Sequence, residues 1–373
     1  MKRILDALFP AGEKQRFSAL DGLRALAAGA VVLHHQPLLR DGAAGVHGHL
    51  AVTVFFVLSA FLLYYPWAKE RARRDLLRYY RNRVWRIFPL YLIVLNIAAL
   101  AALAAGKPVT RLGYVSHLLF VHSFFPREVS HQLLPAAWSL PGEIQFYLLL
   151  PLIAWFIAGR QFPLLLLLTS AGVAVQLLAP SAGRAHAWTP DVMNWPFLSL
   201  PFFLGMLAAW LVANHPRRCR RFAAVGLLGL GYYVFALASG QAQQLLQSSL
   251  PLYSLFNYRG VLPSLFAFLA VAGLAANPQG RCHQLLSVRS LRAMGLCSYS
   301  LFLIHQPLFW FIGSFAPPAM AFVADFLLVV PLAVLSYSFI EAPAMRLGRQ
   351  GFSARPFWRR VRYGVARWAV RAD

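Results

Sequence analysis

The residues best suited to chemistry in this chain are ionisable side chains inside long apolar stretches. Arg24 and His35 are eleven residues apart in the first such stretch. On an α-helix, eleven residues rise by about 16 Å and return to within about 20° of the starting direction. The two side chains therefore share one helix face, which suits a substrate with an anionic end and a distant reacting end. The structural alternative is a snorkelling arginine and a histidine bonded to a neighbouring helix.

A carboxylate, Glu143, lies in another apolar stretch, which begins at Trp138. If this stretch enters from the outer surface, Glu143 lies about 8–9 Å below that surface, at a depth similar to that of His35. A carboxylate beside an imidazole fixes its tautomer and raises its basicity, as a general base requires. The depth match predicts a His35–Glu143 pair, and the alternative is a structural pairing of Glu143 with a buried arginine.

Two further arginines, Arg83 and Arg86, are three residues apart where a third apolar stretch begins. This spacing puts both on one side of a helix. Paired guanidinium groups suit phosphate, so the pair is a candidate for binding a phosphorylated donor. Anchoring at the cytoplasmic membrane surface is the alternative, and it accounts less well for Arg86, which lies inside the stretch.

Weaker candidates lie in the last apolar stretches. His305 lies near the middle of one of them, where packing and ligand contact are equally expected. Asp325 lies in the outer part of the next, where it pairs with Arg259 or lines an acceptor pocket. Glu341 lies at the inner end of the same stretch and is expected to pair with basic loop residues.

The elements that must position these residues are membrane helices. The chain is 59% hydrophobic and 13% charged, with a mean hydropathy of +0.57, whereas soluble domains carry about 25% charged residues. A bilayer span needs about 20 apolar residues. The apolar runs predict an all-α polytopic membrane protein with about ten transmembrane helices, near residues 20–39, 49–67, 84–105, 138–158, 162–179, 196–213, 222–239, 261–276, 296–315 and 318–340.

The basic residues predict the orientation of these spans. With ten spans and a cytoplasmic N-terminus, 27 of the 35 Lys and Arg fall in cytoplasmic segments and 6 in outer ones. This bias is typical of membrane proteins, so both termini are expected to be cytoplasmic.

The net charge of +23 is dispersed between spans, which argues against nucleic-acid binding. Residues 1–345 are predicted to form one membrane domain, and residues 346–373 a basic cytoplasmic tail held by anionic lipid. The basic N-terminus and first apolar run mimic a signal peptide but are expected to be retained. The positions of the three cysteines indicate neither a disulfide framework nor a metal site.

Several motifs occur in an order and spacing that resemble the acyltransferase 3 family from residue 17 to about 346. They are Leu20-Asp21-Gly22-Leu23-Arg24 with His35, Phe55-Phe56-Val57-Leu58-Ser59, Arg83 and Arg86 before Pro89, Trp138-Ser139-Leu140 through Gln145-Phe146-Tyr147, Ser298-Tyr299-Ser300-Leu301 with His305, and Glu341 with Pro343. The chain departs from the family pattern at His34, where an aromatic residue is common, at Ala60, which replaces a glycine, and at Pro141, Gly142 and Ile144.

The resemblance implies a membrane-bound enzyme of a bacterial cytoplasmic membrane. It is expected to move an acyl group, chiefly acetyl, from cytoplasmic acyl-CoA to a hydroxyl of an extracytoplasmic carbohydrate or lipid-linked glycan. His35 is then the general base or a transient acyl carrier, and Glu143 supports it. Arg24, Arg83 and Arg86 bind the CoA phosphates or the thioester carbonyl.

Ser59, His305 and Asp325 are the weaker candidates for contacts with the substrate. A transporter or flippase of an envelope glycan or lipid is the alternative function, since intramembrane charges and proline-broken helices also fit one. The sequence has no repeated halves and concentrates its buried charges in the first four spans, which favours the enzyme.

Overall fold

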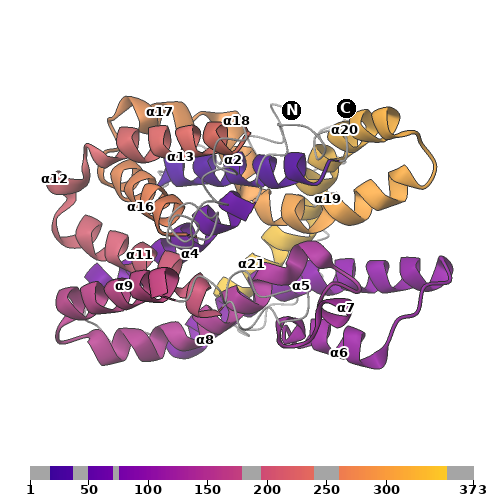
Figure 1. Ribbon diagram of the computed structural model, residues 1–373, viewed down its shortest axis with the longest axis horizontal. Helices are drawn as coiled ribbons and strands as arrows, with labels where there is room; N and C mark the ends of the chain where they lie inside the picture. The colour runs from indigo at the N-terminus through magenta and orange to yellow at the C-terminus, as the bar shows by residue number, and fades with distance from the viewer. Residues whose placement is uncertain (1–16, 37–48, 70–74, 179–194, 239–259, 351–373) are drawn as a thin grey trace.

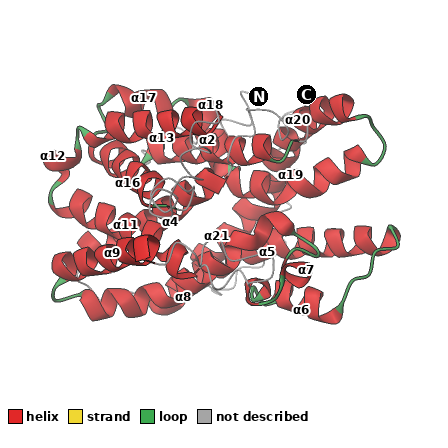
Figure 2. Cartoon of the chain, viewed as in Figure 1, coloured by secondary structure: helices red, strands yellow, loops and turns green. Residues whose placement is uncertain are grey.

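The computed structural model describes residues 17–36, 49–69, 75–178, 195–238 and 260–350. Every regular element in these residues is helical (Figures 1 and 2). The elements are α2 (Ser18–His34), α4 (His49–Lys69), α5 (Leu76–Ala104), α6 (Arg111–Leu118), η1 (His122–Phe124), α7 (Arg127–Ser130), η2 (Pro135–Ser139), α8 (Leu140–Ile157), α9 (Gln161–Leu178), α11 (Trp195–Asn214), α12 (Pro216–Cys219), α13 (Phe222–Ala238), α16 (Val261–Ala276), α17 (Arg281–Leu286), α18 (Arg289–Leu296), α19 (Ser298–Gly313), α20 (Pro318–Ser336), η4 (Tyr337–Glu341) and α21 (Ala342–Gln350).

A helix lies in each of the ten predicted apolar ranges, but the number that could cross a membrane is smaller. Among the described residues, four helical stretches are long and apolar enough, at Leu50–Lys69, Leu76–Ala104, Pro135–Ile157 and Ala319–Gln350, and a bent pair, α18 with α19, makes a fifth. This count fits a membrane protein and does not reach the predicted ten. The physical reason is length, because helices such as α2 with 17 residues and α16 with 16 fall short of the roughly 20 that a span needs.

The centre of the bundle is α4, which packs against α2, α8, α11 and α16. Beside it, α2 lies along α18 and α19 (Figure 1). Two glycines permit this approach, because a Cβ at Gly22 would overlap the carbonyl oxygen of Leu286 and a Cβ at Gly295 that of Asp21. Gly22 therefore has a packing role, because it allows the half of α2 that carries Arg24 to come close to α17 and α18.

The helix that carries the arginine pair, α5, begins at a capped end. The Asp75 side chain accepts a hydrogen bond from the backbone N–H of Arg78 at 2.9 Å, which satisfies one of the free donors of the first turn. Farther along the chain, α18 and α19 meet at Cys297 with a bend of 66°. The bend lies at the N-terminal edge of the ninth predicted span, residues 296–315, where Ser298 and Tyr299 begin α19.

The segment between α5 and α8 folds as short helices that join three longer ones. Tyr91 of α5 donates to the carbonyl oxygen of His117 at 3.0 Å, and the N–H of Ala136 donates to Gln306 of α19 at 2.8 Å. Phe120 is buried at 3% exposure, and its ring lies against that of Tyr91 with 4.2 Å between the centroids. This segment fixes the position from which α8 starts.

Two stacked imidazoles, of His117 and His122, lie inside that segment with their centroids 4.2 Å apart. His117 Nδ1 is 2.7 Å from the carbonyl oxygen of Gly113, and His122 Nε2 is 3.3 Å from that of Ala137. The other nitrogen of each ring is buried without a hydrogen-bond partner. Burial lowers the pKa of both rings, that of His122 to about 3, so both are neutral at physiological pH.

We expect the segment to loosen in acid. A histidine whose folded-state pKa is depressed contributes its full stability above the unfolded value near 6.5, and this contribution is lost as pH falls from there toward 3. For His122 the loss at pH 5 is on the order of 2 kcal/mol. Thermal unfolding at neutral pH and near pH 5 measures it, with His122→Gln as the non-titrating control. Equal acid sensitivity of the two proteins would contradict the assignment.

Candidate functional site

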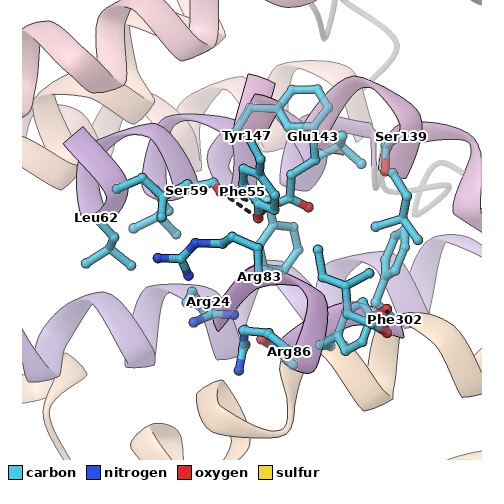
Figure 3. A pocket seen from close by; sticks show the side chains of 18 residues that line it. Arg24, Phe55, Ser59, Leu62, Arg83, Arg86, Ser139, Glu143, Tyr147 and Phe302 are labelled. Carbon is cyan, nitrogen blue, oxygen red and sulfur yellow. Dashed lines mark hydrogen bonds between the residues drawn. The ribbon is translucent and has the colours of Figure 1, made fainter. Parts of the chain in front are cut away.

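A cavity of about 180 Å³ lies between α2, α4, α5, α8 and α19 (Figure 3). Its wall is mostly apolar, but three guanidinium groups reach it, from Arg24 on α2 and from Arg83 and Arg86 on α5. Figure 3 shows these three groups together on one side, with Ser59, Glu143 and Tyr147 along the other. The remaining lining residues are Val52, Phe55, Phe56, Leu58, Leu62, Leu63, Ile87, Ser139, Leu140, Ser298, Tyr299 and Phe302.

Among the described residues that line the cavity, Glu143 is the single carboxylate, and two hydroxyl groups hold it there. Ser59 Oγ donates to Glu143 Oε1 at 2.8 Å, and Tyr147 Oη donates to the same oxygen. Tyr147 lies four residues after Glu143 on α8, so both side chains face the same side of that helix. The carboxylate is therefore fixed in orientation by neutral donors and faces the guanidinium groups as a counter-charge.

The arginine pair is held by different partners. The Arg83 guanidinium carbon lies 5.4 Å from the ring centroid of Tyr79 and 5.9 Å from that of Tyr147, within the range of cation–π attraction. Arg86 Nη1 lies 4.0 Å from Glu341 Oε2 and 3.0 Å from Met345 Sδ. Arg86 therefore has a buried carboxylate as its partner, whereas aromatic rings flank Arg83.

The carboxylate that faces Arg86 owes its position to an irregular turn. Residues Tyr337–Glu341 form a π-helical turn between α20 and α21, and such turns are frequent at functional sites. Glu341 ends this turn and has no exposed surface, and Ser300 Oγ of α19 donates to its Oε1. The sequence predicted a partner for Glu341 in the basic loops, and the structure gives it one inside the bundle.

His35 lies at the other end of α2, against α19. Its Nδ1 is 2.9 Å from the carbonyl oxygen of Val31 and 3.2 Å from Nε2 of His305. His305 Nδ1 is 3.0 Å from the carbonyl oxygen of Leu301. A carbonyl only accepts, so the hydrogen-bond pattern puts the protons on both Nδ1 atoms. His35 then donates to His305 and keeps a lone pair on Nε2.

The predicted pairing of Glu143 with His35 is replaced by two separate groupings. Glu143 bonds to Ser59 and Tyr147 in the cavity, and His35 bonds to His305. The depth argument fixed the level of each residue along its helix, but not which helix lies beside it. In the structure α8 packs against α4 and α5, whereas the histidine end of α2 lies against α19.

The sequence-predicted residues divide between these groupings. Arg24, Ser59, Arg83, Arg86 and Glu143 line the cavity. The rest lie elsewhere in the described part of the chain: His35 with His305, and Asp325 with a hydrogen bond from Gln36. The suggested Asp325 partner, Arg259, lies outside the described residues.

The cavity and the histidine pair are joined through α2 and α19. Arg24 lies in the first half of α2 and His35 directly follows its last residue, about 16 Å of helix rise away. On α19, Ser298 and Phe302 line the cavity, and the ring of Phe302 lies 6.3 Å from that of His305. Phe302 of α19 therefore borders both the cavity and the histidine pair.

Sequence reasoning missed Tyr147 and Gln36 as site residues. The signal for Tyr147 was its spacing of four from Glu143, and that for Gln36 was its spacing of four from Val32 on an otherwise apolar stripe. Within the described residues, no group of three or more His, Cys, Asp or Glu side chains is arranged to hold a metal ion.

Comparison with known proteins gives a family match and several relatives. The model of an acyltransferase domain, of the acyltransferase 3 type, matches residues 17–340. O-acetyltransferase OatA of Staphylococcus aureus is 25% identical, over 90% of this chain and 58% of its own length. A putative peptidoglycan O-acetyltransferase, YrhL of Bacillus subtilis, is 28% identical, over 92% of this chain and 57% of its own.

A third relative, acyltransferase MdmB of Streptomyces mycarofaciens, is 26% identical, over 89% of this chain and 92% of its own length. The chain thus spans somewhat more than half the length of the two O-acetyltransferases and nearly all of the third relative. No solved structure matches the chain.

Proposed function

We propose a function for this chain from the premise that it belongs to the acyltransferase 3 family, whose model matches residues 17–340. The protein moves an acetyl group from acetyl-CoA on the cytoplasmic side of a bacterial inner membrane to a hydroxyl of an extracytoplasmic carbohydrate or lipid-linked glycan. The relatives named O-acetyltransferase support the acetyl group, and the one named for peptidoglycan supports a carbohydrate acceptor. The bias of Lys and Arg supports cytoplasmic termini.

The observation that carries the proposal is the cationic cavity beside the first half of α2, together with the histidine pair at the C-terminal end of that helix. Arg24, Arg83 and Arg86 line one wall of a largely apolar cavity. Guanidinium groups recognise phosphate and polarised carbonyl oxygens, and the apolar wall suits an uncharged acyl arm. These residues bind the CoA phosphates or the thioester carbonyl, so that the arm extends along α2 and α19.

The transfer step needs a base, and we assign this role to His35. Its Nε2 takes the proton of the acceptor hydroxyl as the oxygen forms a bond to the thioester carbon. The carbon–sulfur bond then breaks, and CoA leaves as a thiolate that receives the proton from His35. The products are an ester and free CoA. A transient acyl group on Nε2 of His35 would use the same lone pair in two steps.

His305 is the support of His35 in this mechanism. When His35 becomes cationic, its Nδ1–H donates more strongly to Nε2 of His305. Glu143 acts in the donor cavity instead, where its charge offsets part of the arginine cluster and its two hydroxyl donors keep it in place.

The experiment that tests the function uses inside-out membrane vesicles, which expose the cytoplasmic side to the medium. Radiolabelled acetyl-CoA is added outside, and label is followed into base-labile esters in the lumen and into free acetate. We expect both products with the wild type. A transporter or flippase would yield neither, because such a protein breaks no thioester, and that outcome would contradict the proposal.

A further inference from the structure

Three helices meet in an apolar seam below the histidine pair. Ala28 and Val32 of α2, Leu301 of α19 with Cys297 just before that helix, and Val329 and Ala333 of α20 with Tyr337 form one buried cluster. Within each helix these residues are four apart, so each helix presents one stripe to the seam. The seam therefore fixes the relative position of the residues that follow on each stripe.

On the side of the histidine pair, the next residue of each stripe, one helical turn beyond the cluster, is polar. These residues are Gln36, His305 and Asp325, with exposures of 1%, 1% and 0%. Gln36 Nε2 donates to Asp325 Oδ2, and His305 contacts His35, the residue directly before Gln36. The three stripes thus end in a polar layer that lies outside the wall of the arginine cavity.

Two oxygens in this layer have no hydrogen-bond partner. Both Gln36 Oε1 and Asp325 Oδ1 are buried and unpaired. A buried polar atom without a partner costs about 1–3 kcal/mol, so native proteins rarely keep one unless something else fills the position. Both atoms are acceptors, and the ligand that satisfies them must therefore supply two hydrogen-bond donors.

We propose that Gln36 and Asp325 bind the acceptor through two of its hydroxyl groups, beside the imidazole of His35. The inference rests on the proposed function and deepens it, because it gives the acceptor a site and a chemical class: a polyol with neighbouring hydroxyls rather than a simple alcohol. One hydroxyl is held by Asp325 Oδ1 and another by Gln36 Oε1. The hydroxyl nearer His35 loses its proton and is acylated.

The arginine cavity binds the donor, and the polar layer binds the acceptor, so variants of the two should differ in what they lose. Asp325→Asn keeps the volume and the bond to Gln36 but replaces the unpaired acceptor oxygen with an N–H donor. Gln36→Met removes the other acceptor together with the N–H that donates to Asp325, and it leaves the Asp325 side chain itself unchanged. Ser336→Ala is the matched control, because this serine is also on α20 and its hydroxyl is also buried without a partner.

The test compares two measurements for each protein: base-labile acetate on the envelope of a complemented deletion strain, and hydrolysis of radiolabelled acetyl-CoA by the purified protein in nanodiscs. We expect Asp325→Asn and Gln36→Met to lower envelope acetate by about 10- to 100-fold with hydrolysis unchanged, and Ser336→Ala to change neither.

Unchanged envelope acetate in Asp325→Asn overturns the acceptor site. So does an equal fall in both measurements, because the pair would then act on the donor step. If Asp325→Asn does not accumulate, Gln36→Met decides by the same criteria. Loss of accumulation in both assigns the pair to packing of the seam and also overturns the inference. A wild type that shows neither activity contradicts the proposed function itself, which separates that failure from the others.

Discussion

His35→Ala is expected to lower acyl transfer by about 10²- to 10⁴-fold, the usual loss when a general base is removed. Its Nδ1 is engaged by the carbonyl of Val31 and by His305, so its Nε2 carries the lone pair that accepts the hydroxyl proton. Acetyl transfer in cells measures the effect, alongside expression level and thermal stability. The fold should persist, because His35 follows the last helical residue of α2.

His34→Ala is the matched control for this variant. The two rings are neighbours with centroids 4.9 Å apart, but successive residues of a helix point about 100° apart. We expect a much milder loss for His34→Ala. Transfer that survives in His35→Ala and disappears in His34→Ala would show that the helix register is wrong. Lower expression without a change in specific activity in both variants would assign a structural role to the cluster.

Arg86→Ala is expected to weaken acetyl-CoA binding by about one to two orders of magnitude, since a charge-assisted hydrogen bond contributes roughly 1.5–3 kcal/mol. The affinity of the purified protein for acetyl-CoA measures it. Arg78→Ala is the control, because Arg78 is an exposed arginine at the start of the same helix, α5, and does not line the cavity.

The contact between Arg86 and Glu341 complicates the interpretation of Arg86→Ala, and a double variant resolves it. Arg86 faces Glu341, a carboxylate with no exposed surface, and removal of one partner leaves the other charge buried and uncompensated. Arg86→Ala with Glu341→Gln removes both charges and keeps the shape of the second side chain. We expect the double variant to regain stability and still bind acetyl-CoA weakly. Wild-type affinity of the double variant for acetyl-CoA would show that Arg86 only anchors the helix and does not bind the donor.

Much of the architecture followed from local sequence. Apolar composition determines that a segment is helical and suited to lipid, because the backbone must satisfy its own hydrogen bonds there. For this reason a helix lies in each of the ten predicted ranges, although some of those helices are shorter than a span. Helical periodicity likewise predicted that Arg83 and Arg86 lie on one face of a helix, and both line the same cavity.

The tertiary structure alone decided which side chains meet across helices. Periodicity and depth describe one helix at a time, so they placed Glu143 level with His35 but did not identify its neighbours. The hydrogen bond from His35 joins residues 270 apart, and that from Gln36 to Asp325 joins residues 289 apart.

The sequence by itself therefore determined the family, the helices and the residues that bear charge inside the bundle. The close approach of α2 to α17 and α18, permitted by Gly22 and Gly295, and the seam of α2 with α19 and α20 determined how those residues are combined. Such packing depends on the fit of whole helix surfaces, with small residues where backbones come close. It is a property of pairs of helices, and for that reason only the folded chain separates an arginine cavity from a histidine layer.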